Sequence, residues 1–254
     1  MSLGDWSRPA LFLVGHVPTS GVVTLEGPEG RHAADVRRVR PGEVILVGDG
    51  AGTRARAEVV EVGRAHVAAR IDEVRTEPSS GPRITLAQAL AKGDRGEMAV
   101  EVATEAGIDA IIPWRAERCV TRWDDGPRGA KALAKWRSTA TEAAKQSRRA
   151  WIPEVSEPLT TPQLAQRLAG TTPLLLEATA DASMADVHLA DIDLPGAEIV
   201  LLVGPEGGVT DGETDRLVHA GAVPTRLGPG VLRTSTAAAV ALGALGVRTG
   251  RWAR

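Results

Sequence analysis

The 254-residue sequence contains a single cysteine, no tyrosine and one phenylalanine. One cysteine excludes an internal disulfide framework and any metal site built from several thiolates, and it is typical of a protein from a reducing compartment. Because free cysteine is among the residues most often buried, we expect Cys119 to be a small apolar core residue. The five histidines show no metal-ligand spacing either, so we expect no metal.

The sequence also lacks an apolar run of the roughly 18 residues that a membrane span needs. Its first residues lack the basic start and apolar core of a secretory signal, so the cytoplasm is the default expectation. The net charge of −2 argues against a protein that holds nucleic acid by charge alone. The charge is unevenly distributed, however, because residues 128–150 carry seven basic side chains against one acidic side chain, and residues 31–40 form a second basic cluster.

The pattern of the chain changes near residue 77. Residues 1–76 predict a β-rich domain in which only 30–40 looks helical, and the Pro-, Ser- and Gly-containing stretch 77–82 is the predicted linker. In residues 83–254, apolar runs alternate with amphipathic segments, which predicts an α/β domain with a parallel sheet covered by helices. The predicted strands are LFLVG, VVTLEG, EVILVGDG, TRARAEVVEVG and HVAARIDEV in the first domain, and ITLAQAL, AIIPW, PLLLEA and EIVLLVG in the second. The predicted helices of the second domain are 95–106, 129–149, 160–169, 211–221 and 234–247.

The predicted helix 129–149 has two different faces. The apolar face, which we expect to pack, carries Leu133, Trp136, Ala140, Ala143 and Ser147. The other face is cationic, and it is either an RNA contact or a solvated surface that keeps the protein soluble. We expect the two neighbouring tryptophans, Trp136 and Trp151, to lie in the core rather than to stack on bases.

The most informative stretch is 198–213, EIVLLVGPEGGVTDGE, in which an apolar run of strand length enters a glycine-rich turn and then a helix start. Gly204, Gly207 and Gly208 permit close backbone approach, so the loop can offer N–H and C=O groups to a small molecule at the carboxyl end of a strand. A side chain at Gly207 is therefore expected to occupy ligand space. The letters GPEG recur at 27–30, so only context separates a ligand loop from a plain turn.

A second glycine-rich loop follows one helix later in PTRLGPGVLRTSTAAAVALGALGV, residues 224–247. Its apolar side chains beside free backbone donors suit an adenine ring and ribose better than a triphosphate. Neither loop matches the Walker or GxGxxG phosphate-binding patterns. Arg233, at the entrance of the following helix, is a candidate contact for an anion or RNA. Taken alone, this stretch also fits an ordinary turn and a buried helix.

Together the two loops resemble those of the knotted methyltransferases of the SPOUT superfamily. The resemblance extends to KGDRGEMAVEVATEAGIDAIIPWRAERCV and EAAKQSRRAWIPEV, which are similar to the ribosomal RNA small subunit methyltransferase E family. RHAADVRRVRPGEVILVGDGAG is similar to the signature of that family's small PUA-like β-barrel. The resemblance covers nearly the whole chain.

The resemblance implies a PUA-like RNA-binding β-barrel over 1–76 and a SPOUT α/β domain over 83–254 with a C-terminal trefoil knot, although knots are nearly absent from proteins. It implies a homodimer that uses S-adenosylmethionine to methylate N3 of a uridine in 16S ribosomal RNA. It places the cofactor on Leu176, Glu177, Val203, Gly204, Gly207, Gly208, Leu227, Gly228, Val231, Leu232 and Arg233.

The implied reaction leaves two catalytic candidates. The proton on uracil N3 must be removed, or the uridine anion must be stabilised by a cation, and Arg233 is the candidate for that stabilisation. Glu206 is either a base or a structural acceptor for N–H groups of its loop. The candidate RNA contacts are Arg8, Arg37, Arg38, Lys145, Arg148 and Arg149.

One position departs from the family pattern, because Ser235 stands where the family usually has glutamate. This departure supports a different reading, a non-catalytic RNA-binding or ribosome assembly protein that kept the knotted fold. Within enzymes, the alternative is a knotted methyltransferase that acts on a ribose 2′-hydroxyl.

Overall fold

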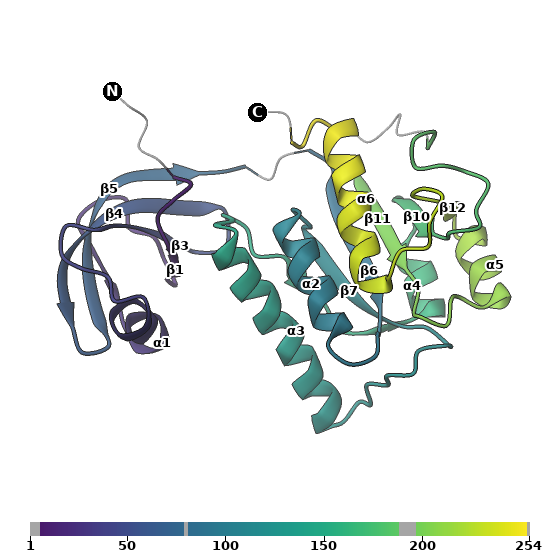
Figure 1. Cartoon of the computed structure of the whole chain (residues 1–254), viewed down its shortest axis with the longest axis horizontal. Helices are drawn as coiled ribbons and strands as arrows, with labels where there is room; N and C mark the ends of the chain where they lie inside the picture. Colours follow the sequence, from purple (N-terminus) through teal and green to yellow (C-terminus); the bar gives the residue numbers. More distant parts are fainter. Residues whose placement is uncertain (1–5, 79–80, 188–196, 253–254) are drawn as a thin grey trace. The chain divides into compact units, whose positions relative to one another are not determined.

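The computed structural model describes residues 6–78, 81–187 and 197–252. These residues divide into two compact units (Figure 1). The first contains the described residues up to 78 together with Ala144–Ile152, and the second contains the remainder. The sequence assigned all of 83–254 to one domain, whereas the structure groups Ala144–Ile152 with the N-terminal unit.

The first unit is built on a sheet in the order β1-β3-β4-β5-β2. Its strands are β1 (Leu11–Leu13), β2 (Val22–Leu25), β3 (Val44–Gly48), β4 (Thr53–Gly63) and β5 (His66–Thr76). β1 pairs with β3 in parallel, and the other neighbours are antiparallel. In the first part of β4, buried Ala55, Ala57 and Val59 alternate with less buried residues, as a strand with one face on a core requires. All five strands predicted for this domain are confirmed.

The helical segment of the first unit begins three residues earlier than predicted. α1 (Gly27–Arg31) runs directly into a π-helical turn, His32–Val36. Pro28 lies in the first turn, where its fixed φ favours a helix start. Gly30 has no room for a side chain, because an added Cβ would lie 2.3 Å from the carbonyl oxygen of Ala65. The first GPEG sequence therefore starts a helix and is not a ligand loop.

The segment Ala144–Ile152 is tied to the first unit by backbone and side-chain bonds. The N–H of Ile152 donates to the carbonyl of Gly50. Lys145 Nζ lies 2.6 Å from Glu29 Oε1, and the lysine side chain is only 6% exposed. A buried ammonium needs such a partner, because an unpaired charge away from water is strongly destabilising.

The second unit contains, in its described residues, a parallel sheet in the order β12-β10-β11-β6-β7-β8, with β9 beside β7. The strands are β6 (Arg83–Ala89), β7 (Ala110–Arg115), β8 (Glu154–Val155), β9 (Leu159–Thr160), β10 (Thr172–Leu176), β11 (Glu198–Val203) and β12 (Val223–Thr225). The four apolar runs predicted as strands form β6, β7, β10 and β11. The two-residue strands β8 and β9 are too short to leave a sequence pattern.

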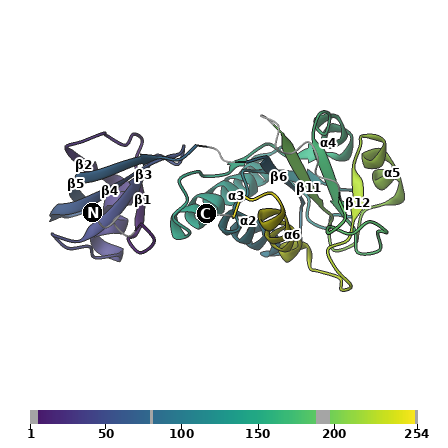
Figure 2. The ribbon, with the colours of Figure 1, turned by 90° about the horizontal axis from the view of Figure 1, so that it is seen from above.

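Helices cover the sheet as the alternating pattern predicted. They are α2 (Arg95–Glu105), α3 (Pro127–Gln146), α4 (Thr161–Arg167), α5 (Asp211–His219) and α6 (Thr234–Arg248). α2 packs against α6, and α4 packs against α5. Figure 2 shows the first pair along one face of the sheet and the second pair along the other. The predicted α/β architecture of this unit is confirmed.

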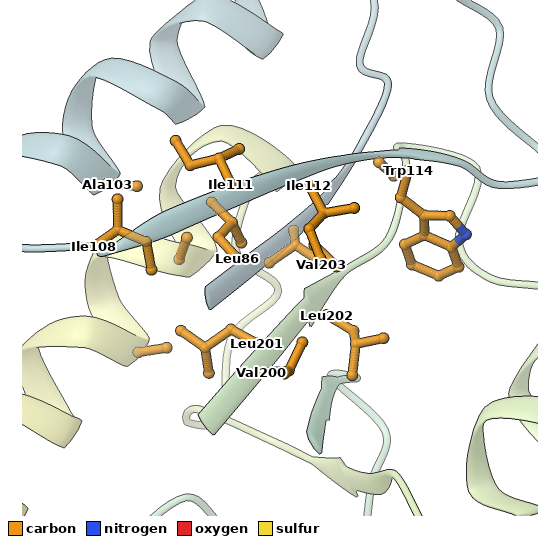
Figure 3. Packing of buried hydrophobic residues seen from close by; sticks show 14 of the residues in the cluster. Leu86, Ala103, Ile108, Ile111, Ile112, Trp114, Val200, Leu201, Leu202 and Val203 are labelled. Carbon is orange, nitrogen blue, oxygen red and sulfur yellow. The ribbon is translucent and has the colours of Figure 1, made fainter. Parts of the chain in front are cut away.

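The core of the second unit lies between the central strands and these helices. Leu86, Ile111 and Leu201, on three neighbouring strands, are fully buried (Figure 3). On α3, the predicted apolar face is buried, with Trp136 2% exposed. Trp151, in the first unit, is 39% exposed, so the expectation of a core position holds only for Trp136.

Cys119 is buried, as predicted from its residue type. Burial raises the pKa of its thiol, backbone hydrogen bonds at Ala116 and Leu90 oppose that shift, and the carboxylates of Glu213 and Glu206 add to it. A thiol with a raised pKa carries little thiolate at neutral pH, so Cys119 is a structural residue and not a nucleophile.

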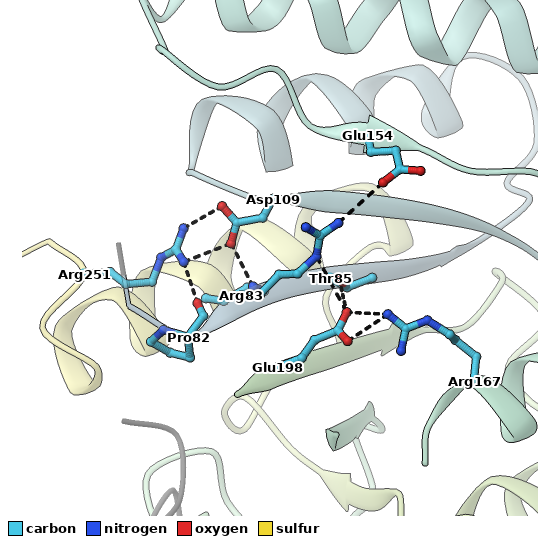
Figure 4. Close-up of polar contacts among 9 residues, drawn as sticks. Pro82, Arg83, Thr85, Asp109, Glu154, Arg167, Glu198 and Arg251 are labelled. Atoms are coloured by element: carbon cyan, nitrogen blue, oxygen red, sulfur yellow. Dashed lines mark hydrogen bonds and ion pairs between the residues drawn. The ribbon is translucent and has the colours of Figure 1, made fainter. Parts of the chain in front are cut away.

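Ion pairs join the strands at the amino edge of the sheet (Figure 4). Arg251 forms two bonds to the carboxylate of Asp109, at 2.9 and 3.0 Å, just before β7. Glu198, the first residue of β11, accepts from Arg167 at 2.8 Å and from the hydroxyl of Thr85 on β6. Side-chain bonds therefore hold the amino edge of the sheet together. The carboxyl edge is formed by the loops that follow the strands.

The close contact between α2 and α3 can be tested at Gly96, the second residue of α2. An added Cβ would lie 2.8 Å from Cζ2 of Trp136, a rigid and buried ring. We expect Gly96→Ala to lower the free energy of unfolding by about 1–3 kcal/mol, measured by urea denaturation.

The matched control is Gly212→Ala, at the second residue of α5, where an added Cβ meets nothing within 4 Å. This variant should be as stable as the wild type or more stable by about 0.4–1 kcal/mol. If both substitutions change the free energy of unfolding equally, the predicted clash with Trp136 is absent.

Candidate functional site

A cavity of about 400 Å³ lies at the carboxyl edge of the parallel sheet in the second unit. β12, β10 and β11 are neighbours, and parallel strands bring their carboxyl ends to one edge. The loops that follow these three strands supply most of the lining. The lining residues are Arg95, Leu176, Glu177, Ala178, Val203, Gly204, Pro205, Glu206, Gly208, Val209, Thr225, Leu227, Gly230, Val231, Leu232, Arg233, Thr234 and Ala237.

The loop after β11 needs glycine at two cavity positions. Gly208 has a φ of +73°, a conformation that side chains rarely adopt. At Gly204, an added Cβ would lie 2.7 Å from Cγ2 of Val209. The backbone therefore passes close to its own next turn, and a side chain at position 204 would clash with Val209.

The far end of this loop is anchored by a buried carboxylate. Thr210 caps α5, and its hydroxyl and the side chain of Glu213 form a capping box. Glu213 is 2% exposed, and its Oε1 also accepts from the backbone N–H of Glu117 at 3.0 Å and from the hydroxyl of Thr161. The buried charge is thus satisfied by several donors, as burial of a carboxylate requires.

Glu206 joins the loop after β11 to the loop after β6. Its Oε1 accepts from the backbone N–H of Lys92 and from Nη1 of Arg95, both at 3.1 Å. Burial alone would raise the pKa of the Glu206 carboxyl, but hydrogen bonds from its own N–H, from Lys92 and from Arg95, with the charge of Arg95, hold that pKa below its ordinary value.

The hydrogen bonds and the lowered pKa bear on the two roles considered for Glu206. A carboxylate stabilised by three donors is a weaker base than a free one, so the geometry favours the structural acceptor. Because the pKa is lowered in the folded state, this contact stabilises the loops at neutral pH, and its contribution is lost as the pH falls through the lowered value.

Arg233 is the last residue before α6, where its extended backbone forms the N-cap. Its side chain is exposed and lines the cavity. Within the described part of the chain, no acceptor holds its guanidinium, in contrast to Arg95. The structure therefore brings a cation without an internal partner to the rim of the cavity.

Nine residues that the sequence placed on a cofactor line this cavity: Leu176, Glu177, Val203, Gly204, Gly208, Leu227, Val231, Leu232 and Arg233. Gly207 and Gly228 do not. A Cβ at Gly207 would lie 3.3 Å from Cβ of Arg118, so this position faces the loop after β7, and its expected contact with a ligand stays a prediction.

Sequence reasoning missed Arg95, Gly230 and Thr234 as cavity residues. Arg95 belongs to the KGDRGE stretch that carried the family resemblance, and its position at the end of the loop between a predicted strand and a predicted helix was the available signal. Ser235, where the family usually has glutamate, is buried and lies outside the cavity lining, so the departure removes no group from the lining of this cavity.

The basic residues predicted to contact RNA have different surroundings. Lys145 is buried against Glu29, so it does not form part of an exposed cationic face. Arg148 donates to the carbonyls of Pro9 and Arg8, and Arg149 also has an interaction partner. Arg8, Arg37 and Arg38 are exposed.

The cationic face of α3 is partly neutralised in the second unit as well. Lys135 pairs with Glu97 at 2.9 Å, and Arg137 pairs with Glu157 at 3.1 Å. The face predicted from charge spacing is therefore largely a set of internal ion pairs.

Among the described residues, no group of three or more His, Cys, Asp or Glu side chains is arranged to hold a metal ion. None of the described helices is both long and apolar enough to span a membrane.

Comparisons with known proteins agree with the two-unit fold. Residues 78–246 match the RNA methyltransferase domain family, and residues 25–72 match the RNA methyltransferase PUA domain. The ribosomal RNA small subunit methyltransferase E of Mycobacterium bovis is 48% identical over 248 residues, 95% of this chain and 93% of that protein.

Solved structures give the same result. The ribosomal RNA small subunit methyltransferase E of Neisseria gonorrhoeae bound to S-adenosylmethionine has a TM-score of 0.84 and 30% identity, covering 95% of this chain and 98% of that one. A Legionella pneumophila methyltransferase in complex with the same cofactor has a TM-score of 0.82 and 30% identity, with equal coverage. This chain therefore belongs to the ribosomal RNA small subunit methyltransferase E family.

Proposed function

We propose that this protein uses S-adenosylmethionine to methylate N3 of a uridine in 16S ribosomal RNA, in the cytoplasm. The observation that carries the proposal is the cavity at the carboxyl edge, where glycine loops and an unpartnered arginine meet. The relatives are named for methylation of small-subunit ribosomal RNA, and two similar structures contain the cofactor.

The cavity fits the cofactor in size and chemistry. Its volume of about 400 Å³ lies within the roughly 300–1,000 Å³ usual for small-molecule sites. Leu176, Leu227 and Val231 offer apolar surface for an adenine ring, and the carboxylate of Glu177 can accept from ribose hydroxyls. Gly204 and Gly208 line the cavity without side chains of their own, so a ligand can approach the loop backbone at these two positions.

The bound cofactor would supply an activated methyl group on a sulfonium. The protein then needs to orient the acceptor nitrogen and to remove or offset the charge that develops on uracil. Arg233 carries a positive charge at the cavity rim, and the unsatisfied N–H groups at the start of α6 add partial positive charge there. Both would stabilise a uridine anion formed by loss of the N3 proton.

A trefoil knot in the second unit is part of the proposal. β12 lies at the sheet edge beside β10, yet the following helix α6 packs against β11 and α2 nearer the middle of the sheet. The segment after β10 accepts hydrogen bonds from residues before and after this crossing. Arg226, directly after β12, donates to the carbonyl of Ala180, and Arg248, at the end of α6, donates to the carbonyl of Val187. These contacts support a chain that passes through a loop.

A homodimer is also proposed. α2 and α6 pack side by side and leave apolar side chains in solvent. Met98 is 46%, Val240 45% and Val247 76% exposed. A second copy of the chain on this face would cover them, in agreement with the dimer that the family resemblance implies.

For RNA, we propose contacts on the loops around the cavity, in addition to Arg37 and Arg38 of the first unit. Thr121 donates to the carbonyl of Ala91, which ties the loop after β7 to the loop after β6. This contact places exposed Lys92 and Arg122 on adjoining loops at the carboxyl edge. Arg118 extends the same group, because its Nη1 donates to the carbonyl of Gly207 at 3.1 Å.

The cofactor assignment can be tested with two glycines of the second loop. An added Cβ at Gly230 or at Gly228 meets nothing within 4 Å, but only Gly230 lines the cavity. Gly230→Val should weaken S-adenosylmethionine binding by about tenfold or more in calorimetric titration, since the side chain takes ligand space. Gly228→Val should bind as the wild type does, and the reverse order would contradict this cavity as the cofactor site.

The catalytic role of Arg233 predicts a loss of turnover with little loss of cofactor affinity. Arg233→Ala should lower kcat by about 100-fold, in the range for loss of one electrostatic stabiliser. Raising the pH should partly restore the rate, because more uracil is then deprotonated without help from the guanidinium.

The matched control is Arg216→Ala, which removes an exposed arginine from α5 outside the cavity lining. Its kcat should equal that of the wild type. If the whole loss in Arg233→Ala lies in S-adenosylmethionine affinity, Arg233 is a cofactor-loop residue and the catalytic group lies elsewhere.

The RNA surface is tested by removing two charges at a time. The double variant Lys92→Ala/Arg122→Ala should weaken RNA binding and reduce the slope of log K against log salt by about 0.7–0.9 per lost phosphate contact. The double variant Arg128→Ala/Lys131→Ala removes two exposed charges from the start of α3 and should leave the slope unchanged. The opposite result would place the RNA on α3.

A further inference from the structure

We propose that Gln88 is a positioning residue that holds the two cofactor loops in register, at a cost in stability. The inference rests on the proposed function, since it assumes that the cavity binds S-adenosylmethionine. Gln88 does not line the cavity and acts through Thr234, which does.

Gln88 is a polar side chain in an apolar place. It lies near the carboxyl end of β6, which runs between β11 and β7, and it is 0% exposed. The residues on either side of it in the strand, Ala87 and Ala89, are small and fully buried. A polar residue there has to be explained by its hydrogen bonds.

Its amide begins a chain of bonds that spans three strand ends. Gln88 Nε2 donates to Thr234 Oγ1 at 2.9 Å, and Thr234 Oγ1 donates to the carbonyl oxygen of Gly204 at 2.8 Å. Gln88 lies near the end of β6, Gly204 directly follows β11, and Thr234 begins α6 after the β12 loop. The end of β6, the loop after β11 and the start of α6 are therefore joined through one hydroxyl.

The surroundings determine the orientation of the amide. Nε2 also donates to the carbonyl oxygen of Ala89 at 3.2 Å. The reversed amide would place Oε1 against that carbonyl oxygen, which is repulsive. It would also need the Thr234 hydroxyl as donor, which would take the proton away from Gly204. The orientation that satisfies all three neighbours makes Gln88 the donor to Thr234.

This orientation leaves Gln88 Oε1 buried with no hydrogen-bond partner among the described residues. An unsatisfied buried acceptor destabilises a protein by about 1–3 kcal/mol, whereas an apolar side chain of similar shape avoids that penalty. Stability alone would therefore favour an apolar residue at this position. Gln88 lowers stability and bonds to a cavity residue. A role in loop geometry explains both features, because residues that serve function are often not those that maximise stability.

In this proposal, the hydrogen bond from Gln88 to Thr234 also controls the position of Arg233. Arg233 immediately precedes Thr234, and the carbonyl of Gly204 fixes Thr234 against the β11 loop. Loss of the Gln88 donor would leave the Thr234 hydroxyl free to rotate away from Gly204. The start of α6, with Arg233, would then lose its fixed distance from the glycine loop, and both cofactor affinity and turnover would fall.

The test is Gln88→Met, which keeps the length of the side chain and removes both polar atoms. We expect a thermal midpoint equal to or above that of the wild type, a Kd for S-adenosylmethionine raised by about tenfold and a lower kcat with 16S ribosomal RNA. Thr234→Val breaks the same chain at its second link. The Kd of the double variant for S-adenosylmethionine should not exceed that of the more affected single variant, because both substitutions break the same chain of hydrogen bonds.

The control is Thr85→Val on the same strand, which removes a buried hydroxyl that donates to Glu198 at the amino edge, away from the cavity. Thr85→Val should lower the thermal midpoint and leave the Kd for S-adenosylmethionine unchanged.

Three results would overturn the proposal: an unchanged Kd in Gln88→Met, a Kd that rises only together with a loss of stability, or additive effects of Gln88→Met and Thr234→Val. Failure of the wild type to bind S-adenosylmethionine would instead reject the proposed function.

Discussion

The parallel alignment of the strands in the second unit is the constraint on which the site depends. Because every strand points the same way, the loops after β10, β11 and β12 meet at one edge and enclose one cavity. The opposite edge carries the ion pairs of Asp109 and Glu198, which fasten the strand starts to one another.

Charge in this protein is used mainly within the fold. Several basic side chains that look available in the sequence are paired, among them Lys145 with Glu29 and Lys135 with Glu97. At the cavity the same contrast recurs, since Arg95 is bound to Glu206 and Arg233 has no such partner in the described residues. Among the described residues, the nearness of a carboxylate, and not the local density of cations, separates these paired cations from Arg233.

The sequence was sufficient to predict which segments are helices and which are strands. It was not sufficient to predict features that depend on contacts between residues far apart in the chain. The apolar runs of β6, β7, β10 and β11 are continuous because both faces are buried, so they could be recognised directly. The two GPEG sequences could not be told apart by their letters. The first starts a helix because Gly30 meets the carbonyl of Ala65, and the second forms a cavity wall beside Val209. The burial of Lys145 depends likewise on Glu29, more than a hundred residues away.

The anchoring of the β11 loop at both ends has a thermodynamic consequence. Its start is held at Gly204 by the hydroxyl of Thr234, and its end is held at Thr210 through buried Glu213. A loop that is already ordered loses little conformational entropy when a ligand arrives, so more of the contact energy appears as affinity. The five residues between these anchors are therefore ordered before any ligand arrives, and the conformational entropy of ordering them is lost during folding.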